Sequence, residues 1–404
     1  MDPTISGSSA IVEKIYTRSF VLLFVAELTV FAAFYTLLPI IPLYIMHMGG
    51  SETDVGLLLG ITGLITLFTA PLFGRAVDHW GSKRILLTGL VIGSLVATSF
   101  AFVKSVISFA LPLTGRSFGT TATNTASRTL VFDIAPASRS GEAISTFMLS
   151  HNFAIAFGPA MGLAIMNGYG FRAPFFATAV LCMVSFGLVA FVREQSVVRR
   201  DASASLETDS QNNRWFVREA LFPATIQFLL SVSYGSTIQF LAVMGEQRDI
   251  NSYQVFFTVY AVVVIVVRFL AGRVSDRYGR AAVLLPSLTS QMIALLILSM
   301  ATSLPALLIA AVTFGMGWGA AYPTLTALTS DRVDVARRGV AMGIFSSGMA
   351  FGSAVGSATV GIIAKQIGFT GSFIFTAFVV LIGLCVCTVG LKMAGELRII
   401  RKEP

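Results

Sequence analysis

Residues 74–84 read GRAVDHWGSKR, and a related stretch, GRVSDRYGR, occupies residues 272–280. A gap-free shift of 198 residues superimposes the two copies, and it pairs Gly74 with Gly272, Asp78 with Asp276 and Gly81 with Gly279. The same shift goes on to align Asp133 with Asp331 and Gly170 with Gly368. Chance similarity between apolar helices does not repeat charged residues and glycines at one constant spacing. The chain is therefore predicted to contain two copies of one structural unit.

The sequence around these motifs is strongly apolar. Of 404 residues, 55% are hydrophobic and only 12% are charged, whereas a soluble domain carries about 25% charged residues. This composition excludes a water-soluble protein of this size and also a disordered chain. The apolar runs are continuous and lack the period-two alternation of a transmembrane barrel. A polytopic α-helical membrane protein is predicted.

Twelve apolar runs are long enough to cross a bilayer, which takes about 20 residues in a helix. They fall at about 19–45, 53–73, 85–103, 106–130, 141–166, 173–192, 219–242, 253–271, 281–301, 304–327, 339–363 and 370–391. The repeat divides them into two parallel six-helix halves, residues 1–192 and 218–404. A polar stretch at 193–217 has the composition of a flexible cytoplasmic linker.

The distribution of basic residues sets the expected orientation. With both termini in the cytoplasm, 22 of the 28 Lys and Arg residues lie on the cytoplasmic side and four on the other. This bias favours a multi-pass cell-membrane protein with an even number of spans and a retained first span. It also explains the net charge of +8 without nucleic-acid binding. The three cysteines lie in apolar runs and give no metal-ligand spacing, so we expect neither a metal nor a cofactor.

The repeated loop resembles the signature of the major facilitator superfamily between spans 2 and 3, and the resemblance covers essentially the whole chain. That signature reads Gly-x-x-x-Asp-Arg-x-Gly-Arg-Arg, from which the first copy departs at His79 and Ser82. The resemblance implies a twelve-span transporter with two six-helix halves. It assigns a conformational role to Gly74, Asp78, Gly81, Arg84, Gly272, Asp276, Gly279 and Arg280.

Two further motifs resemble those of the family's twelve-span drug/proton antiporters. GPAMG at residues 158–162 is similar to the span-5 motif associated with exporters, although Leu163 replaces its second consecutive glycine. The spacing of Gly158 and Gly162 allows close helix contact, and Pro159 allows a bend. RSFG at residues 116–119 is similar to the span-4 motif, with its glycine one residue early. The resemblance therefore implies an exporter.

Glu27 and Arg116 are the candidate proton-coupling residues, because charge inside a span is costly and needs a partner. Glu27 is the only acidic residue deep within a predicted span, and Arg116 is expected to be its partner. Burial favours the neutral carboxylic acid and a nearby guanidinium favours the carboxylate, so Glu27 is expected to gain and lose a proton. The alternatives are a static Glu27–Arg116 pair or an arginine bonded to backbone carbonyls.

A solute cavity is expected where polar and aromatic residues share helix faces near mid-span. Arg268, in contrast, is expected to reach water near the cytoplasmic end of span 8 and to be structural. The pattern suits a lipophilic and in some cases cationic solute, and ordinary aromatic packing is the alternative. The candidate cavity residues are Phe31, Phe34, Thr120, Asn124, His151, Gln227, Tyr234, Trp318 and Tyr322. His151 could equally be a hydrogen-bonded packing residue.

The leading functional prediction is a secondary transporter that exports small amphipathic or lipophilic compounds in exchange for protons by alternating access. Its expected partners are the lipid bilayer, protons and a small solute, and we expect a monomer. The alternative is a facilitator or proton symporter for a nutrient such as a sugar or an organic acid. A membrane enzyme or sensor is more remote, because no catalytic constellation, nucleotide-binding loop or sensor domain is evident.

Overall fold

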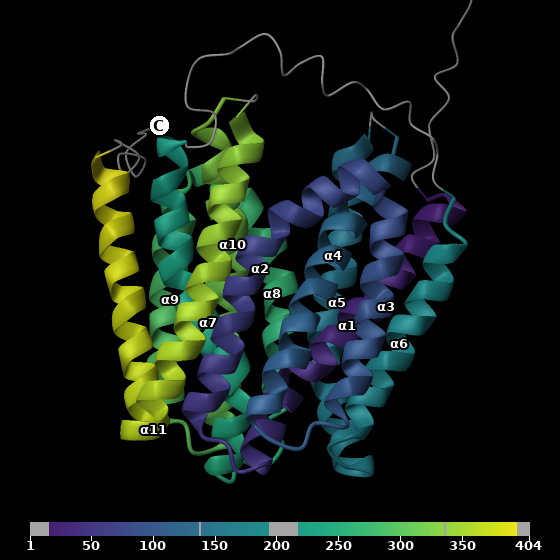
Figure 1. Ribbon diagram of the computed structural model, residues 1–404. Coiled ribbons are helices and arrows are strands. Elements are labelled where there is room, and N and C mark those ends of the chain that lie inside the picture. Colours follow the sequence, from purple (N-terminus) through teal and green to yellow (C-terminus); the bar gives the residue numbers. More distant parts are fainter. Residues whose placement is uncertain (1–15, 137–138, 194–216, 335–336, 394–404) are drawn as a thin grey trace, which may run out of the picture.

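The computed structural model describes residues 16–136, 139–193, 217–334 and 337–393, and these ranges are almost entirely helical (Figure 1). The N-terminal helices are α1 (Arg18–His47), α2 (Glu52–Trp80), α3 (Ser82–Phe100), α4 (Ala110–Ile134), α5 (Ser140–Tyr169) and α6 (Ala173–Ala190). The C-terminal helices are α7 (Leu221–Gln247), α8 (Val255–Tyr278), α9 (Ala281–Met300), α10 (Leu304–Asp331) and α11 (Arg338–Met393). Short 3₁₀ turns, η1 (Ile107–Phe109) and η3 (Arg218–Ala220), precede α4 and α7.

All twelve predicted spans coincide with a helix or a helix segment. Among the described residues, ten helices are long and apolar enough to cross a membrane by length and composition, with α11 counted once. The 56 residues of α11 would extend about 84 Å as one rod, against a hydrocarbon core of about 30 Å. The helix is in fact interrupted at Gly368, so it supplies two spans. The remaining span is α4, whose threonines and arginines make it the most polar.

Consecutive helices run in opposite directions through one bundle (Figure 1). We call the end of the bundle that holds the α2–α3 turn, the end of α6 and the start of α7 the linker side, at the top of Figure 1. The opposite end, which holds the α1–α2 and α5–α6 turns, is the far side. The predicted linker, 193–217, lies outside the described residues except for Arg193 and Val217.

Glycines with positive φ end helices at repeat-related positions. Gly81 and Gly279 on the linker side have φ values of 91° and 87°, and Gly170 and Gly368 on the far side have 82° and 74°. Their ψ values lie between 149° and 176°, a region that is essentially restricted to glycine. The 198-residue repeat therefore reproduces backbone conformation as well as sequence.

Glycines also permit close helix packing within each set of six spans. Gly158 and Gly162 of α5 lie against the backbone of α1, and Gly352 and Gly356 of α11 lie against the backbone of α7. A Cβ atom at Gly158 would lie 2.5 Å from the Cβ of Tyr35. The close helix contact predicted from the GPAMG motif is therefore present, and its counterpart occurs 198 residues later.

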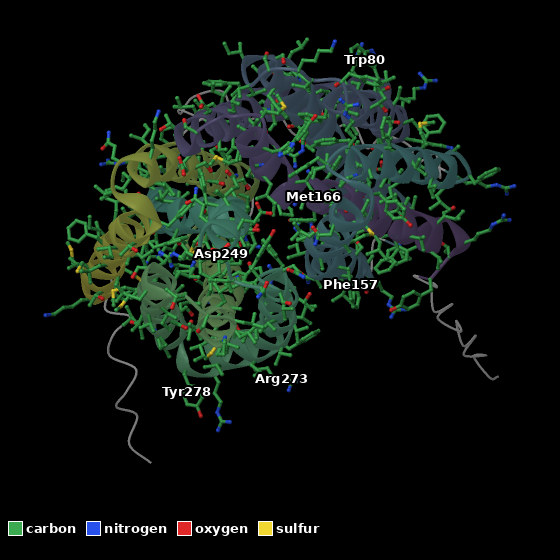
Figure 2. The ribbon with its side chains drawn as sticks, turned by 90° about the horizontal axis from the view of Figure 1, so that it is seen from below. Trp80, Phe157, Met166, Asp249, Arg273 and Tyr278 are labelled. Carbon is green, nitrogen blue, oxygen red and sulfur yellow. The ribbon has the colours of Figure 1, made fainter. Side chains whose placement is uncertain are left out.

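The N-terminal and C-terminal helices meet mainly on the far side and in the middle of the bundle. Near the far-side end of α2, Gly56 and Gly60 pack against α11 at Ser357 and Ala354. One apolar cluster combines the far-side end of α1 with the whole length of α7 and other C-terminal helices, while a second contains only N-terminal helices. Figure 2 views the bundle from the far side, with Arg273 and Tyr278 of α8 at its rim.

Candidate functional site

Glu27 lies in the linker-side half of α1 and is almost completely buried, with 2% of its surface exposed. The hydroxyl of Ser127 on α4, itself fully buried, donates a hydrogen bond of 3.0 Å to Glu27 Oε1. Arg128, the next residue of α4, is exposed and lies close enough to Glu27 for electrostatic attraction. A buried carboxyl group held by one hydroxyl and one nearby guanidinium can exist in either protonation state.

The expected partnership of Glu27 with Arg116 is wrong, because the structure shows no ion pair between them. Arg116 precedes Ser127 by eleven residues, which is about 16 Å along α4. Its side chain lies among Phe34 and Thr178, inside the N-terminal helices, and its Nε has no hydrogen-bond partner among the described residues. Eleven residues complete just over three full turns, at about 3.6 residues per turn. The two positions therefore share a helix face but lie at different depths, and Glu27 lies at the depth of Ser127.

Phe31 and Tyr35 continue the face of α1 that begins at Glu27, and both contact His151 of α5. The Phe31 ring meets the His151 ring edge-on with centroids 4.4 Å apart, and the Tyr35 hydroxyl and His151 Nε2 share a hydrogen bond of 3.0 Å. His151 Nδ1 is buried and has no partner among the described residues. His151 is therefore a hydrogen-bonded residue of an aromatic cluster, with one ring nitrogen still available.

Three aromatic rings of the C-terminal helices form a continuous stack opposite that cluster. The ring of Tyr234 on α7 lies parallel to Trp318 on α10, with centroids 4.1 Å apart and an interplanar angle of 17°. Trp318 stacks in turn on Tyr322, with centroids 6.0 Å apart. Tyr234 also approaches Tyr35 of α1 and Tyr260 of α8. The N-terminal and C-terminal aromatic groups thus meet at the centre of the bundle. We call them the central cluster, whose members are Phe31, Tyr35, His151, Tyr234, Tyr260, Trp318 and Tyr322.

Arg268 joins the two sets of helices at this cluster. Its Nη1 donates a hydrogen bond of 2.8 Å to Oδ1 of Asn152 on α5, and its guanidinium lies 5.9 Å from the centre of the Tyr322 ring. Arg268 was expected near the cytoplasmic end of span 8, and that position is wrong. The residue lies near the middle of α8, and its side chain is held between α5 and α10 instead.

The repeated loops connect helix ends on the linker side. In the second copy, the Arg280 guanidinium binds Asp276 at 2.9 Å and Asp331, at the end of α10, at 2.8 Å. Partial burial lowers the pKa of Arg280, but the hydrogen bonds and charges of Asp331 and Asp276 outweigh this and hold the pKa above its usual value. In the first copy, Ser82 takes the place of Arg280 and donates a hydrogen bond of 2.7 Å to Asp133. The repeat therefore preserves this connection despite the change of side chain.

Comparisons with known proteins agree with this architecture. The sequence profile of the Major Facilitator Superfamily matches residues 23–256 and 223–398. The chain belongs to the major facilitator superfamily. It is therefore a multi-pass membrane transporter of small solutes rather than an enzyme, and its motifs place it close to the drug/proton antiporters of that superfamily.

Relatives within the superfamily match nearly the whole chain. YuxJ of Bacillus subtilis, an MFS-type transporter, is 25% identical and covers 93% of this chain and 98% of its own. Multidrug resistance protein 2 of Bacillus subtilis is 23% identical and covers 86% and 89%. A crystal structure of a variant of the nucleoside transporter NupG superimposes with a TM-score of 0.77 at 13% identity, covering 92% and 99% of the two chains. This last likeness shows the shared fold alone.

Of the other predicted cavity residues of this superfamily member, Phe34 contacts Phe31 of the central cluster, with ring centroids 6.4 Å apart, whereas Thr120, Asn124 and Gln227 bond within their own helices. The amide of Asn124 bonds the carbonyl of Thr120, and the hydroxyl of Thr120 bonds the carbonyl of Arg116, all within α4. Gln227 is fully buried in α7 and donates to Ser231 of its own helix. Phe34 lines the small space beside Arg116. The polar face of α4 thus bonds largely to its own backbone, and Ser127 is the member that reaches Glu27.

Sequence reasoning missed Tyr35, Tyr260 and the position of Arg268. Glu27, Phe31 and Tyr35 are spaced four residues apart, so helical periodicity from Glu27 would have found Tyr35. Tyr260 is 1% exposed and lies in a run of apolar residues that offers no such signal. Arg128 was counted with the linker-side loop, although α4 continues to Ile134.

Proposed function

We propose that this transporter exports amphipathic or lipophilic aromatic compounds in exchange for protons. The observation that carries the proposal is the burial of Glu27, the single buried acidic or basic residue among those the structure describes. Its position on α1 places a carboxyl group about 6 Å along the helix from Phe31, at the edge of the central cluster. An ionisable residue that is buried inside a membrane protein is expected to have a functional role, because burying it is costly.

Exchange follows if a proton and a basic group of the solute compete for the same carboxylate. With Glu27 ionised, its negative charge attracts the basic group of a solute whose aromatic body lies on the cluster. When a proton binds Glu27, that attraction is lost and the solute is released. The two cargoes then occupy the transporter alternately, which is the requirement for exchange.

We further propose that the linker side faces the cytoplasm and that the structure is open toward it. The support for this orientation is the excess of basic residues in the linker-side loops. The contacts that join the two sets of helices, such as the Thr53 hydroxyl bonded to the Gly361 carbonyl, concentrate on the far side. Transport would require these far-side contacts to break while the linker-side ends approach each other.

The relatives lend support to export as the direction of transport. Multidrug resistance protein 2 is similar over most of its length, and its name describes resistance to several drugs. The GPAMG motif on α5 is similar to the one associated with exporters. Neither feature concerns the chemistry at Glu27, so the exchange needs a test of its own.

Transport by purified protein in proteoliposomes tests the proposal. A suitable probe is a naphthalene ring that carries a trimethylammonium group, because this cation does not itself bind or release protons. A proton gradient is expected to drive the probe against its concentration gradient, and Glu27→Gln is expected to abolish the driven movement. Glu219→Gln is the matched control, because it neutralises an exposed carboxyl group on η3. Full gradient-driven transport by Glu27→Gln would refute the proposal.

Proton-coupled uptake of an organic acid is the second candidate function. The observation that favours it is Arg268, a guanidinium in the central cluster that binds the neutral Asn152 rather than an acidic residue. An acid bound there would bind more tightly when Glu27 is protonated, so acid and proton would travel together. In the same proteoliposomes, the direction of proton movement that accompanies the solute separates the two candidates.

A further inference from the structure

Arg268 is a membrane-embedded cation without an acidic partner. Among the described residues, its one hydrogen bond is that from Nη1 to Asn152, and no carboxylate lies within ion-pair distance. Its Nε is buried and has no hydrogen-bond partner. A charged group in this position is costly unless its charge and its donors are satisfied. The arrangement therefore leaves a donor and a positive charge for a group that the protein does not supply.

The other charged groups near the central cluster reinforce the positive charge. Tyr35 of α1 lies within electrostatic range of three guanidinium groups, those of Arg116, Arg128 and Arg268. His151 of α5 lies near two of them. Against these stands the single carboxyl group of Glu27. The helices that meet here thus carry an excess of positive charge even when Glu27 is ionised, which favours an anionic group in the site.

The surroundings of Arg268 also define the shape of the group that fits. The guanidinium lies over the ring of Tyr322, at one end of the stack formed by Tyr234, Trp318 and Tyr322. A flat aromatic body can extend this stack while an oxyanion attached to it reaches the guanidinium. His151 Nδ1 is a second polar atom in the cluster without a partner.

We propose that Arg268 binds an acidic group, a carboxylate or a similar oxyanion, on a planar aromatic solute. Asn152 binds Nη1 and so positions the guanidinium, whose Nε has no hydrogen-bond partner among the described residues. This assignment rests on the proposed function only in taking the central cluster as the solute site, and it does not depend on the direction of transport.

The assignment narrows the solutes that can be exchanged for protons. A solute with an acidic group alone binds more tightly when Glu27 is protonated, so it travels with the proton. A solute that also carries a basic group directed toward Glu27 competes with the proton and is exchanged for it. Glu27 and Tyr35 are separated by about 12 Å along α1, which is the scale of two fused aromatic rings with a substituent at each end. Zwitterionic aromatic compounds are thus the class that satisfies both charged residues.

Equilibrium binding to the purified full-length protein tests this inference with probes on one ring system. The probes are 2-naphthoate, its uncharged methyl ester, and a naphthalene that carries both a carboxylate and a trimethylammonium group. Wild-type protein is expected to bind 2-naphthoate more tightly than the ester. Arg268→Gln is expected to weaken binding of the two carboxylates by about 10- to 100-fold, the range for a hydrogen bond to a charged group, and to leave the ester within about twofold.

Two further variants keep the result interpretable. Arg277→Gln removes an equal charge from the exposed face of the same helix and is expected to leave all three affinities unchanged. Arg268→Lys preserves the charge but not the planar donor set, so it is expected to recover part of the carboxylate affinity. Size-exclusion profiles and thermal stability report whether each variant is folded. If Arg268→Gln misfolds, the Lys variant and the comparison of acid with ester in wild-type protein carry the test.

Equal binding of acid and ester by wild-type protein would overturn the inference, as would equal weakening of both by Arg268→Gln or by Arg268→Lys. This outcome is distinct from failure of the proposed function. Gradient-driven transport of the permanently cationic probe would still depend on Glu27 if only the assignment of Arg268 were wrong. Conversely, carboxylate binding that depends on Arg268 would survive the finding that Glu27 carries no proton.

Discussion

Replacing Gly81 with alanine isolates the backbone conformation that the turn between α2 and α3 requires. Gly81 has φ 91° and ψ 149°, and a Cβ atom added there meets no other atom within 4 Å. The cost of alanine is therefore conformational, on the order of 1–3 kcal/mol for this region of the φ/ψ map. Gly74 provides a matched control, because it belongs to the same motif and also has open space around its Cβ position.

Gly74 differs from Gly81 in its backbone, which is helical. Alanine is a better helix former than glycine by about 0.5–1 kcal/mol, so Gly74→Ala is expected to be neutral or stabilising. The two variants should consequently differ by about 1.5–4 kcal/mol in the free energy of unfolding. Titration of the purified protein with SDS in mixed micelles, followed by far-UV circular dichroism, measures that difference.

The repeat offers a second measurement of the same quantity. Gly279 has φ 87° and the corresponding place between α8 and α9, so Gly279→Ala is expected to reproduce the loss seen with Gly81→Ala. The reasoning would be refuted if Gly81→Ala were as stable as the wild type. It would also be refuted if Gly74→Ala lost as much stability as Gly81→Ala.

Three further outcomes follow from the contacts. Gly162→Leu places a side chain against the Thr36 carbonyl of α1, so it should abolish the monodisperse peak of folded protein in size-exclusion chromatography. A monodisperse, folded Gly162→Leu variant would show that close packing of α5 against α1 is not required. Asp331→Asn weakens the bonds to Arg280 and should slow transport in proteoliposomes without changing solute affinity; an altered affinity would contradict this. Trp318→Ala removes the middle ring of the stack and should weaken binding of the naphthalene ester about 2- to 10-fold, as measured by fluorescence titration. An unchanged affinity would exclude the stack as the surface that binds the aromatic part of the solute.

The fold could be predicted from the sequence because its determinants are periodic and local. Apolar runs of spanning length recur twelve times, and the 198-residue shift aligns Gly81 with Gly279 and Gly170 with Gly368. Only glycine adopts the backbone conformation at these turns without strain. The spacing of these glycines in the sequence therefore indicated that the two sets of helices share one architecture. Even the Ser82–Asp133 bond corresponds to Arg280–Asp331, although the side chains at the first position differ.

The site was less predictable, because it depends on depth within the membrane and on contacts between distant helices. Glu27 was correctly expected to be buried, but pairing the one deep acidic residue with an intramembrane arginine selected Arg116, whereas Ser127 is the residue of α4 at the depth of Glu27. Arg268 meets Asn152 through the packing of α8 against α5, although the two residues are 116 positions apart in the sequence. No local pattern specifies that pairing. The stack of Trp318 on Tyr322, in contrast, has the four-residue spacing of a helix and was recognised from it.

Competition between proton and solute at Glu27 underlies the proposed exchange, and proton release on solute binding measures that competition directly. A pH-indicator dye in weakly buffered detergent solution reports protons released when the permanently cationic naphthalene probe is added to purified protein at a pH where Glu27 is protonated. Competition at Glu27 predicts that wild-type protein and Glu219→Gln release protons and that Glu27→Gln releases none. Proton uptake by the wild type, or equal release by Glu27→Gln, would contradict it.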